Sequence, residues 1–122
     1  MKRSMFIALV ILIAAFVTAP AFAAKPPSIE ILTCDGGATI KVNTNVGVKI
    51  ANWTDGAKYD VLIVDTVNTM TKLKEVLGAT MMNGVIFCTG YTPTGLAGHT
   101  LRMQVKNTAT QAAVLKNFSV SQ

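Results

Sequence analysis

The residue types best suited to chemistry in this chain are a cysteine, a histidine and a methionine that lie within one short stretch. Cys88, His99 and Met103 supply a thiolate, an imidazole and a thioether. Sulfur and imidazole ligands of this kind bind copper. Copper binding is therefore the first chemistry to consider.

The order of these residues resembles the closing loop of blue-copper proteins, in which the ligands lie on a β-sandwich. Such a site needs a second histidine, but His99 is the only histidine in the chain. The ten residues between Cys88 and His99 also exceed the few that are usual in that loop. If Cys88 forms a disulfide, no thiolate is left for a metal. We therefore assign no metal site and keep only His99 and Met103 as candidate ligands.

Other catalytic groupings are not favoured. Asp60 and Asp65 are the candidates for a glycosidase pair of carboxylates, but each lies at one end of an expected strand and is expected to face water. Asp35 offers a single carboxylate, whereas calcium requires several oxygen ligands. No serine lies in a sharp nucleophile turn. The sequence predicts no enzymatic activity and no cofactor.

Cys34 and Cys88 are the only two cysteines of the chain. An oxidising compartment favours their pairing, so the sequence predicts a Cys34–Cys88 disulfide. In the chain-entropy account, a cross-link that closes a loop of this length stabilises the fold by about 4 kcal/mol. Two buried thiols, or one reactive thiol, are the alternatives.

The first 23 residues have the pattern of an export signal. Lys2 and Arg3 form a positive head, residues 5–17 are apolar, and residues 21–23 give the small-x-small pattern that a signal peptidase recognises. The apolar run is shorter than the roughly twenty residues that span a bilayer. We expect residues 1–23 to be cleaved, with no membrane span left afterwards, and residues 24–122 to form one secreted or periplasmic domain.

The composition of that domain limits its partners. Its 99 residues suit a single domain. Nine basic residues stand against six acidic ones, which gives a net charge of +3. The basic residues are scattered and are not grouped with aromatic residues, whereas a nucleic-acid site needs a dense basic face with rings for stacking. Nucleic acid is therefore excluded as the expected partner.

The domain reads as short β segments separated by turn residues about every ten positions, which is typical of antiparallel all-β domains. Residues 67–78 fit a helical stripe or a strand, and we favour the strand because its neighbours are strands. Asn83 and Gly84 predict a type I′ hairpin turn. The remaining expected strands cover residues 28–34, 39–43, 46–53, 59–65, 85–89, 101–106 and 113–120.

Seven or eight strands and one disulfide predict a two-sheet sandwich of immunoglobulin or fibronectin type III character. Antibody domains carry a tyrosine two positions before the second cysteine. That position is Ile86 here. The likeness is therefore architectural, and the antibody type of disulfide is not expected.

The sequence thus predicts an exported, non-enzymatic sandwich that acts by contact. It would be a structural or protein-interaction module at the cell surface, in the periplasm or in an extracellular assembly, with a protein partner or further copies of itself. Loops on a rigid scaffold commonly carry recognition, and an exposed sheet edge can accept an added strand. The alternative is a small-ligand or copper carrier in the periplasm. The expected contact residues lie in the glycine-rich loop of residues 90–98 and are Tyr91, Thr92, Pro93, Thr94 and Leu96.

Export gives the first testable prediction. We expect the protein recovered outside the cytoplasm to begin near Ala24, as read by intact mass spectrometry. Ala23→Arg removes the small residue that the peptidase needs, so this variant should keep its first 23 residues. A wild-type protein that still carries its apolar head outside the cytoplasm would contradict the assignment.

Overall fold

The computed structural model describes residues 25–122, and this part of the chain forms seven strands. The expected signal peptide, residues 1–23, lies outside the described residues. Within residues 25–122 no helix is long and apolar enough to cross a membrane. The strands are β1 (Ser28–Thr33), β2 (Val46–Ala51), β3 (Lys58–Asp65), β4 (Thr71–Thr80), β5 (Ile86–Cys88), β6 (Thr100–Asn107) and β7 (Ala113–Ser119).

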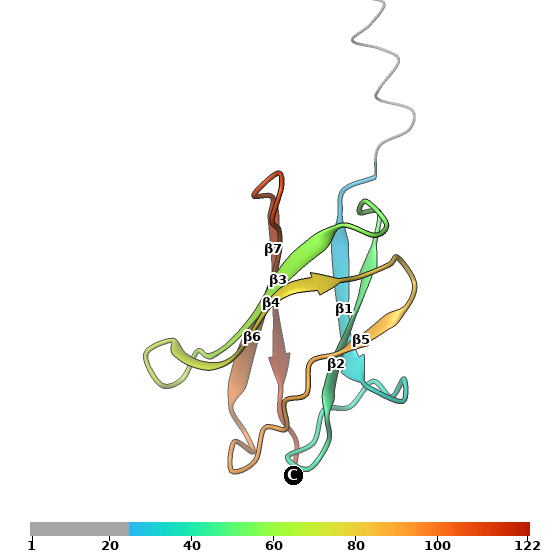
Figure 1. Cartoon of the computed structure of the whole chain (residues 1–122). Helices are drawn as coiled ribbons and strands as arrows, with labels where there is room; N and C mark the ends of the chain where they lie inside the picture. Colours follow the sequence, from blue (N-terminus) through green and yellow to red (C-terminus); the bar gives the residue numbers. More distant parts are fainter. Residues whose placement is uncertain (1–24) are drawn as a thin grey trace, which may run out of the picture.

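The strands form two antiparallel sheets that face each other (Figure 1). One sheet has the order β1-β2-β5 and the other the order β4-β3-β6-β7. In an immunoglobulin constant domain the fourth strand belongs to the sheet of the first, second and fifth strands. Here β4 pairs with β3 instead, so the strands are divided between the two sheets differently from those of a constant domain. The predicted all-β, two-sheet sandwich is confirmed, with seven strands.

The core lies between the sheets and follows the two-residue period of a strand. In β3 and β6 every second residue is buried, and the residues between them are half-buried. The inward residues of β2 complete the centre of the core. The fully buried strand residues are Val46, Val48, Ile50, Tyr59, Val61, Ile63, Leu101, Met103 and Val105.

The expected strand at residues 39–43 is wrong. Its residues make one bridge, between Lys41 and Ser121, and a turn in which the Thr44 N–H donates to the Lys41 carbonyl then redirects the chain. Ile40 and Val120 are both buried here. The segment closes one end of the core and does not extend a sheet.

The hairpin expected at Asn83 and Gly84 is also wrong, because β4 and β5 belong to different sheets. A type I′ turn needs positive φ at both central residues, and only Gly84 has it. The Asn83 amide instead accepts the Trp53 N–H (2.9 Å) and donates to the Trp53 carbonyl (2.8 Å) and to Asp55 (2.7 Å). These bonds hold the crossover of residues 81–85 against the loop between β2 and β3.

The ambiguous segment at residues 67–78 contributes most of β4, so the favoured strand is confirmed for residues 71–78, while residues 67–70 form a turn. Two register shifts interrupt its pairing with β3, one between Tyr59 and Val61 and the other between Ile63 and Val64. Gly78 supplies a positive φ of 68° close to the first shift. These bulges bend β4, which is the edge strand of its sheet.

Gly47 lies at the centre of the three-stranded sheet, opposite Leu32 on one side and Cys88 on the other. A Cβ atom at this position would lie 2.9 Å from Cγ2 of Ile86 and 3.3 Å from the Leu32 carbonyl oxygen. The neighbouring strands therefore close over the space that a side chain would need. Glycine is required here because of that close approach.

We expect Gly47→Ala to lower the free energy of unfolding by about 1–3 kcal/mol, the usual cost of overpacking. Chemical denaturation measures this change. Ile86→Ala removes the opposing methyl group. The double variant should therefore lose less free energy of unfolding than the two single variants lose when their losses are added. A Gly47→Ala protein as stable as wild type would show that the contact is not tight.

Candidate functional site

The candidate site is one end of the sandwich, called here the loop end. It consists of residues 34–45, which connect β1 to β2, and residues 89–99, which connect β5 to β6. Both connections lie at the lower end of the molecule in Figure 1. Two segments distant in sequence therefore share one surface.

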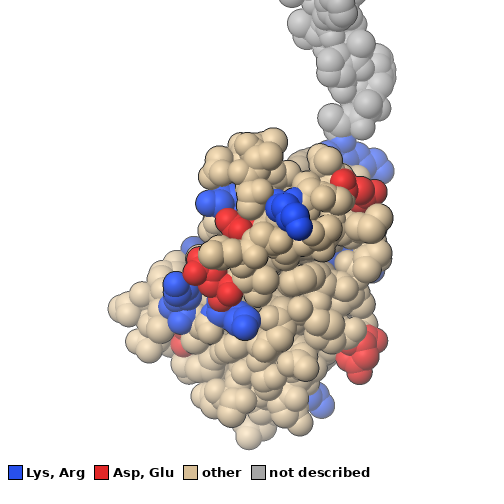
Figure 2. All heavy atoms as spheres, viewed as in Figure 1, with Lys and Arg blue, Asp and Glu red and all other residues tan. Residues whose placement is uncertain are grey.

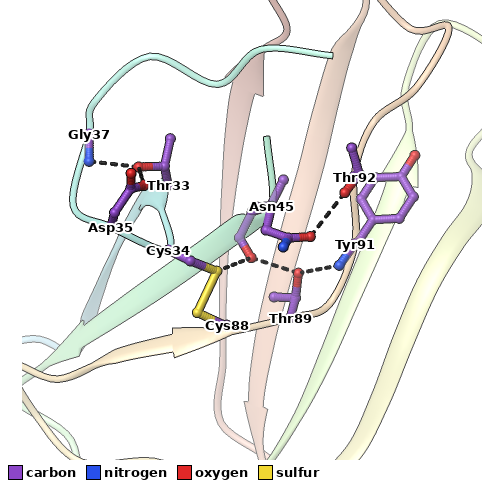
Figure 3. Close-up of a disulfide and its surroundings, with 10 residues drawn as sticks. Thr33, Cys34, Asp35, Gly37, Asn45, Cys88, Thr89, Tyr91 and Thr92 are labelled. Carbon is purple, nitrogen blue, oxygen red and sulfur yellow. Dashed lines mark hydrogen bonds between the residues drawn. A yellow bond between two sulfur atoms is a disulfide. The ribbon is translucent and has the colours of Figure 1, made fainter. Parts of the chain in front are cut away.

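The predicted Cys34–Cys88 disulfide is present at this end (Figure 3). Cys34 follows β1 and Cys88 ends β5, and these are the two outer strands of the three-stranded sheet. The Cα atoms lie 5.4 Å apart. In antibody domains the disulfide instead joins the two sheets. Here the cross-link ties the two borders of one sheet together beside its central strand.

Hydrogen bonds join the second loop to the first loop and to the start of β2. The Thr92 hydroxyl donates to the Asn45 side chain (2.9 Å), and the Val46 N–H donates to the Tyr91 carbonyl (2.9 Å). The Thr89 hydroxyl, which is buried, donates to the Val46 carbonyl (2.8 Å). Figure 3 shows the Thr92 side chain directed at Asn45, with Thr89 between them and the disulfide. The loops are therefore held by polar contacts as well as by the covalent link.

The start of the first loop is a compact polar turn. The Thr33 hydroxyl donates to Asp35 (2.7 Å) and accepts the Gly37 N–H (2.7 Å). The hydrogen bond from Thr33, helped by the backbone N–H of Asp35 itself, holds the pKa of Asp35 below its ordinary value. Asp35 is thus occupied within its own turn.

Asp65 is buried, with 3% of its surface exposed, so the expectation that it faces water is wrong. It accepts a hydrogen bond from Nδ1 of His99 (2.9 Å) and another from the Val67 N–H (3.0 Å). Desolvation acts to raise the pKa of Asp65, but these hydrogen bonds outweigh it and hold the pKa below the ordinary value. The pair fixes the end of the second loop to the end of β3.

The geometry defines what this pair can do. An ionised Asp65 can only accept hydrogen bonds, so Nδ1 of His99 carries the proton and Nε2 is free in the neutral ring. An aspartate and a histidine in this arrangement form two members of a hydrolase triad. Within residues 25–122 no hydroxyl or thiol is hydrogen-bonded to His99. The pair therefore orients the histidine, and in the described part of the chain no nucleophile is hydrogen-bonded to its ring.

The structure distributes the expected contact residues unevenly between surface and core. Pro93 is fully buried, and Tyr91 and Leu96 pack against the core. Burial, followed by the negative charge of Asp65, raises the pKa of Tyr91. Thr94 is exposed, and Thr92 is half-buried and bonded to the other loop. The glycine-rich loop therefore contributes to the core as well as to the surface.

The candidate copper ligands are not brought together. Cys88 is in the disulfide, Met103 is fully buried in the core, and His99 is bonded to Asp65. In the described part of the chain no three or more His, Cys, Asp and Glu side chains are grouped so that they could hold a metal ion.

The surface of the loop end is polar and carries little charge. Its two loops contain only Asp35, Lys41 and His99 as ionisable side chains besides Tyr91 and the cysteines. On the face drawn in Figure 2, most charged side chains gather over the upper part and few lie at the lower end. An open hollow of about 500 Å³ lies here and is lined by Cys34, Asp35, Asn43, Thr44 and Asn45.

The pairing of Asp65 with His99 was missed from sequence, although a signal for it exists. Tyr59, Val61 and Ile63 alternate on the inner face of β3, and continuing the same period places Asp65 on that face too. A buried carboxylate requires a partner. The single histidine of the chain was one candidate, alongside the lysines and the arginine of the domain.

The low pKa of Asp65 gives a prediction of pH dependence. The Asp65 carboxyl group binds a proton more tightly in the unfolded chain than in the folded one. The stabilisation that ionised Asp65 gives to the fold is therefore complete above the ordinary pKa of about 4, and it is lost as the pH falls through the lower pKa of the folded protein. We expect the melting temperature of Asp65→Asn to lie below that of wild type at neutral pH. The difference between the two melting temperatures should become smaller as the pH is lowered. Glu30→Gln, at an exposed ion pair, is the control and should melt close to wild type. A difference that is constant with pH would contradict the prediction.

The comparisons with known proteins supply no relative. No protein family, no curated protein and no solved structure matches this chain. Its function is therefore argued from the geometry of the molecule.

Proposed function

We propose that this protein is an exported, non-catalytic contact module, a structural subunit or a protein-binding domain of the cell surface, the periplasm or an extracellular assembly. The observation that carries the proposal is the joining of two distant loops into one fixed surface. The Cys34–Cys88 disulfide ties the first loop to the end of β5, where the second loop begins, and Thr92 contacts Asn45 across the two loops. The His99–Asp65 pair then fixes the second loop to the sandwich.

Fixed loops suit recognition because binding then costs little conformational entropy. The loop end offers hydroxyl and amide groups, among them Asn43, Thr44 and Thr94, which are exposed or half-buried. Such groups form hydrogen bonds across polar, hydrated protein interfaces. The partner that this surface fits best is a folded protein that contacts both loops at once.

Strand addition at the edge of the four-stranded sheet has less support. The two register shifts in β4 interrupt the regular row of backbone groups that an added strand would need. Lys72 and Lys74 lie along this edge, and edge lysines discourage pairing with another chain. The loop end is therefore the favoured contact surface for a partner.

A copper carrier has less support as well, because the thiolate that would bind the metal is oxidised. An enzyme is less favoured because the His99–Asp65 pair lacks an adjacent nucleophile within residues 25–122. The hollow beside the disulfide is open and polar. It suits a side chain of a partner better than an enclosed apolar ligand, which needs a deep pocket.

Site-specific photo-crosslinking in the producing cells tests the proposal. A photoreactive residue replaces Ala97, which is exposed at the loop end, and in a second variant Ala109, which is exposed in the turn between β6 and β7. These positions lie beyond opposite ends of β6. We expect a covalent adduct with one protein from position 97 and none from position 109.

A charge at the contact surface provides the control for specificity. Ala97→Lys should weaken binding of the crosslinked partner by about tenfold, because an uncompensated charge is costly in a protein interface. Ala109→Lys should leave binding unchanged. Equal adducts from both positions, or none from position 97, would overturn the assignment of the loop end.

A further inference from the structure

A long uncharged segment runs along one flank of the sandwich. Between Glu75 and Arg102 the chain has no Asp, Glu, Lys or Arg. This segment forms the second half of β4, the crossover of residues 81–85, β5 and the following loop. In Figure 1 the crossover and β5 lie together at one side of the molecule.

The crossover exposes apolar side chains next to β5. Met82 and Val85 are 52% and 57% exposed. The Val85 N–H donates to the Met82 carbonyl (3.2 Å), so the two residues lie within one turn. Exposed apolar groups close together mark interaction surfaces more often than isolated ones do.

The free edge of β5 lies beside these side chains. Thr89 donates its N–H to the Val46 carbonyl (3.0 Å), so Thr89 and, two residues earlier, Phe87 direct their backbone groups toward β2. In an antiparallel pair, successive residues direct their backbone N–H and C=O groups alternately toward and away from the neighbouring strand. Ile86 and Cys88 therefore direct their N–H and C=O groups away from β2. Since β5 ends its sheet, these groups face the open edge.

The other edge strands are better protected. The β4 edge carries the two register shifts and the lysines described above. On the opposite flank β1 and β7 lie close together, and the Lys116 amine of β7 reaches the Ile29 carbonyl of β1 (3.5 Å). The β5 edge has neither a lysine nor a bulge of its own. It is the edge most open to another strand.

We propose that the β5 edge, flanked by Met82 and Val85, is a self-association site at which a second copy of this chain docks. The two β5 strands pair antiparallel about a two-fold axis at Phe87. Ile86 of each copy then lies opposite Cys88 of the other, and each such pair exchanges two hydrogen bonds. The two three-stranded sheets become one continuous sheet.

The distribution of charge favours a second copy of this chain as the partner that docks at the β5 edge. The expected mature chain has nine basic and six acidic residues, so two copies carry net charges of the same sign. The uncharged flank is a place where identical surfaces meet without like charges facing one another. A two-fold contact also requires a self-complementary surface, and an antiparallel pair of identical strands satisfies this requirement.

Analytical ultracentrifugation of the mature protein over a range of concentrations tests the proposal. We expect a reversible, non-covalent dimer. Val85→Lys should raise its dissociation constant by about a hundredfold, because it places a charge opposite Thr89 of the second copy, within a segment that holds no acidic residue to compensate it. Leu115→Lys is the matched control, since Leu115 lies on β7 and is 55% exposed against 57% for Val85. Its dimer should be as tight as that of wild type.

Amide hydrogen exchange identifies the edge independently of substitution. The Ile86 and Cys88 amides should gain protection as the protein concentration rises, whereas the Phe87 amide, already bonded within the sheet, should be protected throughout. A monomer at every concentration, equal weakening by both lysine variants, or no change at Ile86 and Cys88 would overturn the proposal. None of these outcomes bears on the loop end, whose test uses other positions.

Discussion

The arrangement of this domain depends on the closure of its three-stranded sheet at Gly47. Because position 47 has no side chain, Leu32 and Ile86 approach each other across β2. The Cys34–Cys88 bond then joins the two borders of the same sheet at that end. A small domain buries a modest core, so a covalent link that also fixes two loops contributes to stability and to the shape of the surface together.

A second constraint arises from the inner face of β3. The alternation that buries Tyr59, Val61 and Ile63 continues to Asp65, which places a carboxylate at the border of the core. Burial of a charge is tolerated when hydrogen bonds compensate for the lost water. His99 and the Val67 N–H supply them. The need to pair one buried acid thus determines where the β5–β6 loop ends.

The fold was predictable from sequence where local periodicity and burial agree. The uninterrupted apolar run of residues 61–64, the alternation in β6 and the two cysteines were enough for the sandwich and its disulfide. The structure around Asn83 was not predictable in this way, because the Asn83 side chain bonds to Trp53 and Asp55, which are distant in sequence. The strand predicted at residues 39–43 was wrong for a related reason, since the pairing of this segment with Ser121 is a single bridge and too short to make a strand.

The candidate site was predictable only in part. Glycine content marked residues 90–98 as a loop, but only the three-dimensional structure shows that Pro93 is buried and that Thr92 contacts Asn45. Contacts between loops depend on how the sheets twist and pack, and no local pattern encodes them. The edge of β5 belongs to the same class, because its exposure follows from the crossover that places β4 and β5 in different sheets.

The position of the disulfide also divides the chain into a covalent ring and two open arms. The ring contains β2, β3, β4 and β5, while β6 and β7 follow it and are attached through a single backbone path. A protease that cuts the exposed turn at Val67 and Met70 leaves both fragments tethered through sulfur. A cut between β6 and β7 leaves β7 held by hydrogen bonds and packing alone. The consequence of a single cut is therefore unequal along this molecule, because only a cut within the ring leaves the fragments covalently joined.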